Sequence, residues 1–191
     1  MRIPTVCALA LLLAAAAPPP EAERMVPGGR SGFVADGAGG CWVWAGGIRR
    51  GAEDLVASWT GACPDGPAEG EGRAVVRWRE DGRDRAMIYD GPVRRGKNEG
   101  RGRILHVEGG RVRATAEGLF RNDHFVEGRF ELPLQGLVYE GGWSTSGPQG
   151  QGRVTQGGRS FEGVWDSGCL RTETGWLSFT RPTEECEGVR T

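Results

Sequence analysis

The chain has 191 residues, 26% of them charged, and a formal net charge of −1 at pH 7. This balance lacks the basic surplus of nucleic-acid-binding domains, so nucleic acid is not an expected partner. Glycine accounts for 34 residues, far above the usual share of about 7%. No stretch shows a sustained helical periodicity, and an all-β fold is therefore expected.

The N-terminal segment, residues 1–22, has the organisation of a secretory signal peptide. Met1 and Arg2 give it a positive start, residues 6–17 form an unbroken apolar run, and a proline-rich stretch ends it. A transmembrane helix needs about 20 apolar residues, and this run is far shorter. The sequence therefore predicts export to the periplasm or secretion, without a transmembrane segment.

Residues 23–40 contain two glycine-rich runs, 27–29 and 37–40 with one alanine, and few apolar side chains. This composition predicts a flexible lead-in. No comparable linker follows, so residues 41–191 are expected to form one extended domain.

Four cysteines remain after the predicted signal peptide, an even number in an exported chain. Three pairings are open, and the local one joins Cys41 to Cys63 and Cys169 to Cys186. Each bridge would stabilise an end of the domain by about 3 kcal/mol. In this hypothesis residues 41–44 pair antiparallel with residues 59–63. Zinc is the alternative, but no Cys-x-x-Cys pair is present to seed a site, and no metal or cofactor is expected.

A short pattern recurs along the chain and is clearest at Tyr139, Gly141 and Trp143. Residues two apart on a β-strand point to the same face, so the glycine leaves a gap between two rings. We expect the ring of a neighbouring unit to fill this gap. The aromatic and glycine positions on the repeat face are Trp59, Gly61, Tyr89, Gly91, Tyr139, Gly141, Trp143, Phe161, Gly163 and Trp165.

Five units follow this pattern, and the third is degraded. It has Ala116 in place of the first aromatic residue, followed by Gly118 and Phe120, and its later glycine, Gly128, comes one place late. Each unit reads as a β-hairpin: a strand, a glycine-rich turn and a second strand. Because a lone hairpin is marginal in water, the units are expected to stack on one another.

At these residues the sequence resembles the membrane occupation and recognition nexus (MORN) repeat, whose pattern is Tyr-x-Gly-x-Trp, a turn glycine and then Gly-x-Gly. The resemblance covers residues 56–168. It implies consecutive hairpins in one elongated, twisted antiparallel sheet, usually without catalytic activity. It further implies contacts with proteins and, in some members, with lipid.

Basic residues gather around one expected hairpin turn, and a single surface of them would suit an anionic lipid, a polysaccharide or an acidic protein. The alternative is an ordinary solvated face. The residues are Arg94, Arg95, Lys97, Arg101 and Arg103.

No catalytic residues are predicted. His124 follows Asp123, but adjacent strand residues point to opposite faces and would not converge. Glu140 and Glu162 are expected on the sheet surface opposite the rings. The leading hypothesis is an exported, non-catalytic repeat module that binds a protein or a cell-envelope component. The alternative is a small carboxylate-dependent hydrolase on a β-sheet scaffold, which would need a concave polar cluster.

Overall fold

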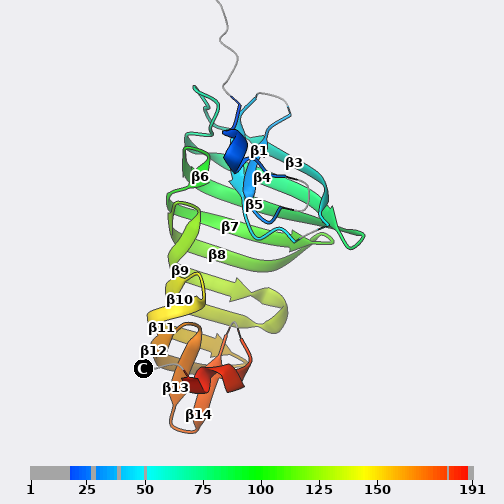
Figure 1. Cartoon of the computed structure of the whole chain (residues 1–191). Coiled ribbons are helices and arrows are strands. Elements are labelled where there is room, and N and C mark those ends of the chain that lie inside the picture. The colour runs from blue at the N-terminus through cyan, green and yellow to red at the C-terminus, as the bar shows by residue number, and fades with distance from the viewer. Residues whose placement is uncertain (1–17, 27–28, 38–39, 50, 180, 189–191) are drawn as a thin grey trace, which may run out of the picture.

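The computed structural model describes residues 18–26, 29–37, 40–49, 51–179 and 181–188. The protein is all-β, and its strands follow one another in a long 12-stranded antiparallel sheet, as predicted (Figure 1). The strands along this sheet are β3 (Glu53–Trp59), β4 (Gly70–Glu80), β5 (Arg83–Arg94), β7 (Gly100–Glu108), β8 (Arg111–Arg121), β9 (His124–Leu132), β10 (Leu137–Ser144), β11 (Gly147–Gln156), β12 (Arg159–Asp166), β13 (Cys169–Thr172) and β14 (Gly175–Ser178), with β6 (Lys97–Asn98) paired to β5.

Two-residue turns connect most of the long strands, and their sequences explain why. The pairs Asp81-Gly82, Gly109-Gly110 and Gly157-Gly158 all have positive φ angles. Two successive positive φ angles give the tight hairpin turn whose twist matches that of the flanking strands. The β9–β10 connection differs, because it contains the short 3-10 helix η2 (Pro133–Gln135), which ends at Gly136.

A column of glycines crosses the sheet from β4 to β12. Backbone register pairs Gly72 with Gly91, and later Gly141 with Gly152. The remaining members are Gly102, Gly118, Gly128 and Gly163. A Cβ atom added at either Gly141 or Gly152 would meet the ring of Tyr139.

The same rings therefore cover the glycines of their own unit and of the adjoining strand. Tyr139 covers Gly141 and Gly152. In the same way Tyr89 covers Gly91 and Gly102, and Trp59 covers Gly61 and Gly72. This corrects the expectation that the ring of a neighbouring unit fills the gap. In the first, second and fourth units the first aromatic residue folds back over its own glycine. In the fifth unit Phe161 is exposed, and a Cβ added at Gly163 would meet Leu170 instead.

Each of these rings is also anchored by a hydrogen bond to the carbonyl three residues ahead. Trp59 Nε1 donates to the Ala62 carbonyl at 2.9 Å, and the Tyr89 hydroxyl donates to Pro92 at 3.0 Å. The Tyr139 hydroxyl donates to the Gly142 carbonyl at 2.9 Å. The polar atom of a buried aromatic ring is thus satisfied in the same way in three units.

A ladder of alternating charges runs beside the glycine column on the outer face. Its eight residues, one on each of β4, β5 and β7–β12, are Arg73, Asp90, Arg103, Glu117, Arg129, Glu140, Arg153 and Glu162. Every cross-strand neighbour carries the opposite charge, and the Arg153–Glu162 pair closes to 2.6 Å. This places Glu140 and Glu162 opposite the rings, where the sequence predicted them.

The N-terminal end of the sheet is covered by a separate hairpin of β1 (Gly32–Ala35) and β2 (Trp42–Ala45). The predicted Cys41–Cys63 disulfide joins this hairpin to the first repeat unit. The hypothesis that residues 41–44 pair with residues 59–63 is wrong, because β2 pairs with β1. Strand β1 lies within the segment 23–40 that was expected to be a flexible lead-in. These residues form a strand because Phe33 and Val34 are apolar and become buried.

The C-terminal end is closed by the 3-10 helix η3 (Thr183–Gly188), which packs on β14. The predicted Cys169–Cys186 disulfide joins η3 to β13, and both cysteines are fully buried. An additional element therefore packs on the strands at each end of the sheet.

The predicted signal peptide lies mostly outside the described residues. Its last part includes Pro19, which is buried, and Glu21, which begins the short 3-10 helix η1 (Glu21–Glu23). Within the part of the chain that the structure describes, no helix is long and apolar enough to span a membrane.

Candidate functional site

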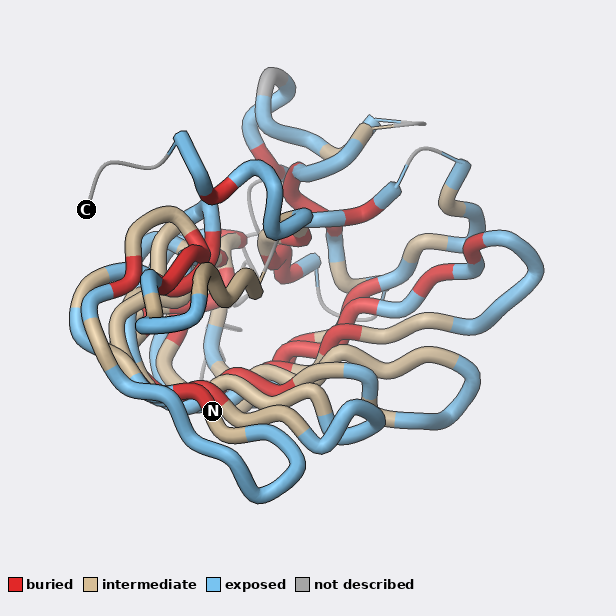
Figure 2. The backbone as a smooth tube through the Cα atoms, turned by 90° about the horizontal axis from the view of Figure 1, so that it is seen from below, coloured by how far each residue is buried: buried red, intermediate tan, exposed pale blue. Residues whose placement is uncertain are grey.

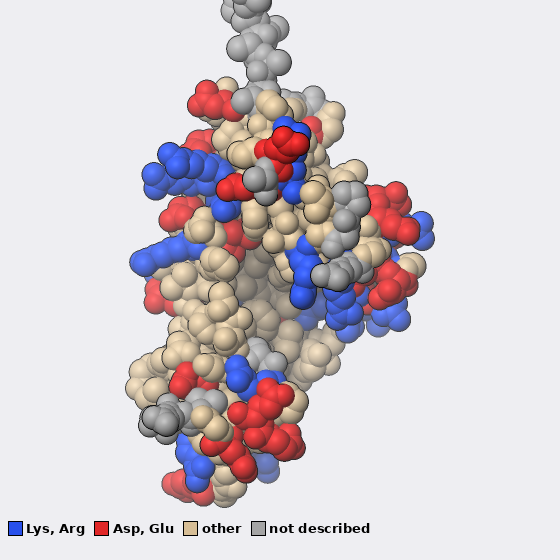
Figure 3. All heavy atoms as spheres, viewed as in Figure 1, with Lys and Arg blue, Asp and Glu red and all other residues tan. Residues whose placement is uncertain are grey.

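The sheet is curved, and its buried segments line the inner side (Figure 2). On this inner side the N-terminal hairpin and strands β4–β10 line a half-open cavity of about 520 Å³. The face seen in Figure 3 is hollowed between the two ends of the molecule, and mostly uncharged residues surround the hollow. Acidic and basic side chains are instead interspersed along its flanks.

The cavity lies at the third repeat unit, where the repeated ring is missing. Ala116 occupies the position held by Tyr89 and Tyr139 in the neighbouring units, and it lines the cavity. The nearest atoms that a Cβ added at Gly118 or Gly128 would meet belong to the facing backbone, whereas at Gly152 they belong to the ring and hydroxyl of Tyr139. Ala116 therefore supplies no ring of its own to cover this glycine pair, although Gly118 is itself buried.

This third unit is nevertheless a regular hairpin. Strands β8 and β9 pair antiparallel from Thr115 to Arg121, with a single register shift between Leu119 and Phe120. Its turn consists of Asn122 and Asp123, with φ angles of 48° and 70°. Asparagine and aspartate tolerate this left-handed conformation better than other non-glycine residues do.

Aromatic rings form one wall of the cavity. Phe120 packs against Phe125 with ring centroids 5.4 Å apart, and Phe130 stacks on Trp143 at 4.6 Å. Tyr89 continues this wall, with its ring centroid 5.3 Å from that of Phe120. Phe125, Phe130 and Trp143 are only half-buried, so ring surface faces the cavity.

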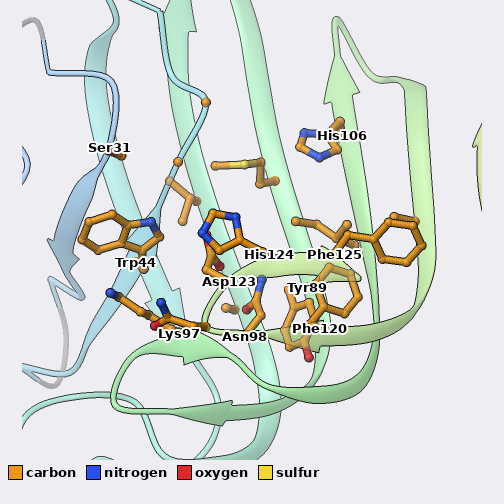
Figure 4. Close-up of a pocket in the computed structure, with 18 of the residues that line it drawn as sticks. Ser31, Trp44, Tyr89, Lys97, Asn98, His106, Phe120, Asp123, His124 and Phe125 are labelled. Carbon is orange, nitrogen blue, oxygen red and sulfur yellow. The ribbon is translucent and has the colours of Figure 1, made fainter. Parts of the chain in front are cut away.

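Polar side chains form the opposite wall (Figure 4). Lys97 lies with its Nζ 4.4 Å from the ring centroid of Trp44, a cation–π contact that links β6 to the N-terminal hairpin. The backbone also ties these elements together, since Trp44 donates to the Gly96 carbonyl and Asp123 donates to the Asn98 carbonyl. The polar wall is therefore held in place by main-chain hydrogen bonds.

Asp123 is the most strongly perturbed acid of this wall. Burial raises the pKa of its carboxyl to about 7, while a hydrogen bond from the Asn98 backbone and the charge of Lys97 act in the opposite direction. His106 also lines the cavity, and burial lowers the pKa of its imidazole. A carboxylic acid in this setting is poised to exchange its proton near neutral pH.

The structure corrects the argument that separated Asp123 from His124. Alternation of side chains holds within a strand, but Asp123 belongs to the turn and β9 begins only at His124. Both residues line the cavity. The sequence did contain a signal that pointed to these two residues, because Asp123 and His124 fall within the unit that departs most from the repeat.

The five basic residues do not share one surface. Lys97 lies on the cavity side over Trp44, whereas Arg103 lies on the outer face, 3.9 Å from Glu117. Arg101 is exposed on the outer face beside it, and Arg94 and Arg95 are exposed at the β5–β6 turn. The backbone N–H of Arg95 donates to the Glu69 carboxylate at 2.9 Å. An anionic partner would thus meet at most part of this set at once.

Sequence reasoning named some of the residues that line the cavity, such as Tyr89, Lys97 and Trp143, but it missed Trp44, Phe125 and Phe130. Trp44 comes from the N-terminal hairpin, whose packing on the sheet no repeat pattern encodes. Among the residues the structure describes, no cluster of histidine, cysteine or acidic side chains suits a metal ion.

Comparison with known proteins gives no match, either to a family model or to a curated protein.

Proposed function

We propose that this chain is an exported, non-catalytic binding module of MORN-like repeats, located in the periplasm or secreted. In this proposal its partner is a protein or a cell-envelope component, and the contact is made in the cavity at the third repeat unit. The observation that carries the proposal is the position of the cavity. It lies where Ala116 interrupts the repeated ring, and an interruption of a local rule is expected at a functional site.

Export is supported by two independent features of the chain. The N-terminal segment has the organisation of a signal peptide. Two disulfides close the ends of the sheet, and disulfides persist mainly in oxidising compartments outside the cytosol.

The alternative function, a carboxylate-dependent hydrolase, draws support from Asp123, whose pKa of about 7 suits a general acid. A glycosidase-type reaction needs a second carboxyl group across the substrate. Among the described residues that line the cavity, Asp123 alone carries one. Glu140 and Glu162 lie on the outer face in ion pairs with arginines. This arrangement favours binding over catalysis.

The experiment fills the cavity and leaves the rest of the protein unchanged. The Ala116→Tyr substitution restores the aromatic residue of a complete unit and places its ring in the cavity. Val164→Tyr is the matched control, because it adds the same ring at an exposed position, 55% accessible, on β12. The exported protein and both variants are immobilised and exposed to a solubilised envelope fraction, and the retained proteins and glycans are quantified.

The proposal expects one component to be retained by the unsubstituted protein and by Val164→Tyr, and to be lost with Ala116→Tyr. Equal retention by all three proteins would place the contact elsewhere. Circular dichroism of each variant establishes that the fold is intact.

A further inference from the structure

We infer that the cavity binds a neutral saccharide segment, stacked on its aromatic wall and hydrogen-bonded by Lys97 and Asp123. This inference rests on the proposed binding function and names the chemistry of the ligand.

The aromatic wall supplies the first argument. Phe125, Phe130 and Trp143 present half-buried ring surface to the cavity. One face of a pyranose ring consists of C–H groups, and it packs flat against an aromatic ring while its hydroxyls remain free at the edges. Half-buried aromatic rings are the usual contact elements of a binding surface, because they bring large area at low conformational cost.

The balance of charge supplies the second argument. Lys97 and Asp123 are the lysine and the acidic residue among the described cavity-lining side chains, and arginine and glutamate are absent from that set. A strongly anionic ligand would face the Asp123 carboxylate, and a cationic ligand would face the Lys97 ammonium. A net neutral ligand avoids both repulsions.

The types of hydrogen-bonding group supply the third argument. Lys97 can only donate, an ionised Asp123 can only accept, and the side-chain amides of Asn98 and Asn122 do both. A hydroxyl group is a donor and an acceptor at once. A ligand rich in hydroxyls can therefore hydrogen-bond to each of these groups, whereas an aliphatic chain would displace water from them without replacing its hydrogen bonds, at a cost.

The size of the cavity agrees with this choice. Its volume of about 520 Å³ lies within the range of about 300–1,000 Å³ typical of small-molecule sites. It suits a short segment of a glycan and not a folded protein domain.

The test is a titration of the exported protein with uncharged trisaccharides, namely maltotriose, cellotriose and tri-N-acetylchitotriose. Binding is followed by tryptophan fluorescence, since Trp44 and Trp143 line the cavity, and by calorimetry. A trimer of galacturonic acid and an uncharged, leucine-rich octapeptide are titrated in parallel. The variants are Ala116→Tyr, Val164→Tyr, Lys97→Gln and Asp123→Asn.

We expect at least one neutral trisaccharide to bind with an affinity that is insensitive to salt between about 0.05 and 0.5 M, because no net charge is neutralised. Val164→Tyr should bind equally well. Ala116→Tyr should abolish binding, and Lys97→Gln and Asp123→Asn should each weaken it by about tenfold. The last two substitutions lie on the polar wall and test the inference even if Ala116→Tyr does not fold.

Three outcomes overturn the inference. The first is the absence of any heat or fluorescence change with every neutral trisaccharide up to about 10 mM. Any binding would then be weaker than about −3 kcal/mol, and a neutral saccharide would be ruled out as the ligand. Tighter, salt-sensitive binding of the galacturonate trimer would assign an anionic glycan instead. Binding of the octapeptide that Ala116→Tyr blocks would assign an apolar peptide, and the proposed binding function would survive. That function fails only if envelope capture is also unaffected by Ala116→Tyr.

Discussion

The ring of Tyr139 lies directly against Gly152 on the neighbouring strand. A Cβ atom at Gly152 would come within 2.6 Å of Tyr139 Cζ, closer than real Cβ contacts allow. The same ring covers Gly141, whose φ angle is 153°. The close approach of ring and backbone thus requires glycine on both strands.

Substitution of Gly141 by valine should be strongly destabilising. The added side chain would meet the Gln151 carbonyl at 2.5 Å and the Tyr139 hydroxyl at 2.6 Å, and the backbone conformation disfavours a β-branched residue. We expect a loss of about 2–4 kcal/mol in the free energy of unfolding. Gly37→Val is the control, because no atom lies within 4 Å of its added Cβ. Equal melting temperatures for the two variants would refute the role of the glycine column.

The sheet and its repeat were predictable because a period of two residues within the strand and recurring glycines encode them locally. Tyr139, Gly141 and Gly152 are read directly from spacing. The direction of the Tyr139 ring was not predictable. Whether the ring covers its own glycine or a neighbour's depends on the side-chain rotamer and on the hydrogen bond to the Gly142 carbonyl. Spacing carries no information on either.

The cavity depends on contacts that are distant in the sequence. Trp44 approaches Lys97 through a hairpin that lies outside the repeat, and its place follows from burial of Phe33 and from the Cys41–Cys63 bridge. The charge ladder was partly visible, since each arginine or acid adjoins a column glycine. Its continuity emerges only when the register of neighbouring strands is known.

Each of the two disulfides should stabilise only its own end of the sheet, because they lie at opposite ends. Non-reducing peptide mapping of the exported protein should recover Cys41 joined to Cys63 and Cys169 joined to Cys186. Cys186→Ser should lower the free energy of unfolding by about 2–4 kcal/mol and release η3 first. Hydrogen exchange is then expected to rise in β13 and β14 and to stay unchanged in β4 and β5. Protection lost evenly along the sheet would show that the bridge does not act as a local cap.

The charge ladder should contribute more to the register of neighbouring strands than to the free energy of unfolding. Two guanidinium nitrogens of Arg153, Nε and Nη2, donate to the same oxygen, Glu162 Oε2, but the two side chains are 54% and 62% exposed. A double-mutant cycle with alanine at both positions should give a coupling of about 0.2–1 kcal/mol that weakens as salt is raised. Lys or Arg at Glu162 should cost more than alanine, because it would face Arg153 directly. A coupling that does not change with salt would contradict an electrostatic ladder.

The carboxyl of Asp123 should make stability depend on pH in a direction set by its raised pKa. Between pH about 4, where an unfolded aspartate ionises, and pH about 7, its value in the folded protein, the folded state holds the proton more tightly. Stability from this group is therefore full at low pH and is lost as pH rises to 7. Lys97, His106 and His124 also line the cavity, so the effect of Asp123 is isolated by comparison with Asp123→Asn, which retains all three. Denaturant unfolding of both proteins from pH 4 to pH 8 should show the unsubstituted protein losing on the order of 4 kcal/mol relative to Asp123→Asn, with most of the loss complete by pH 7. A constant difference across this range would mean that Asp123 is solvated in the folded protein and ionises at its ordinary pKa.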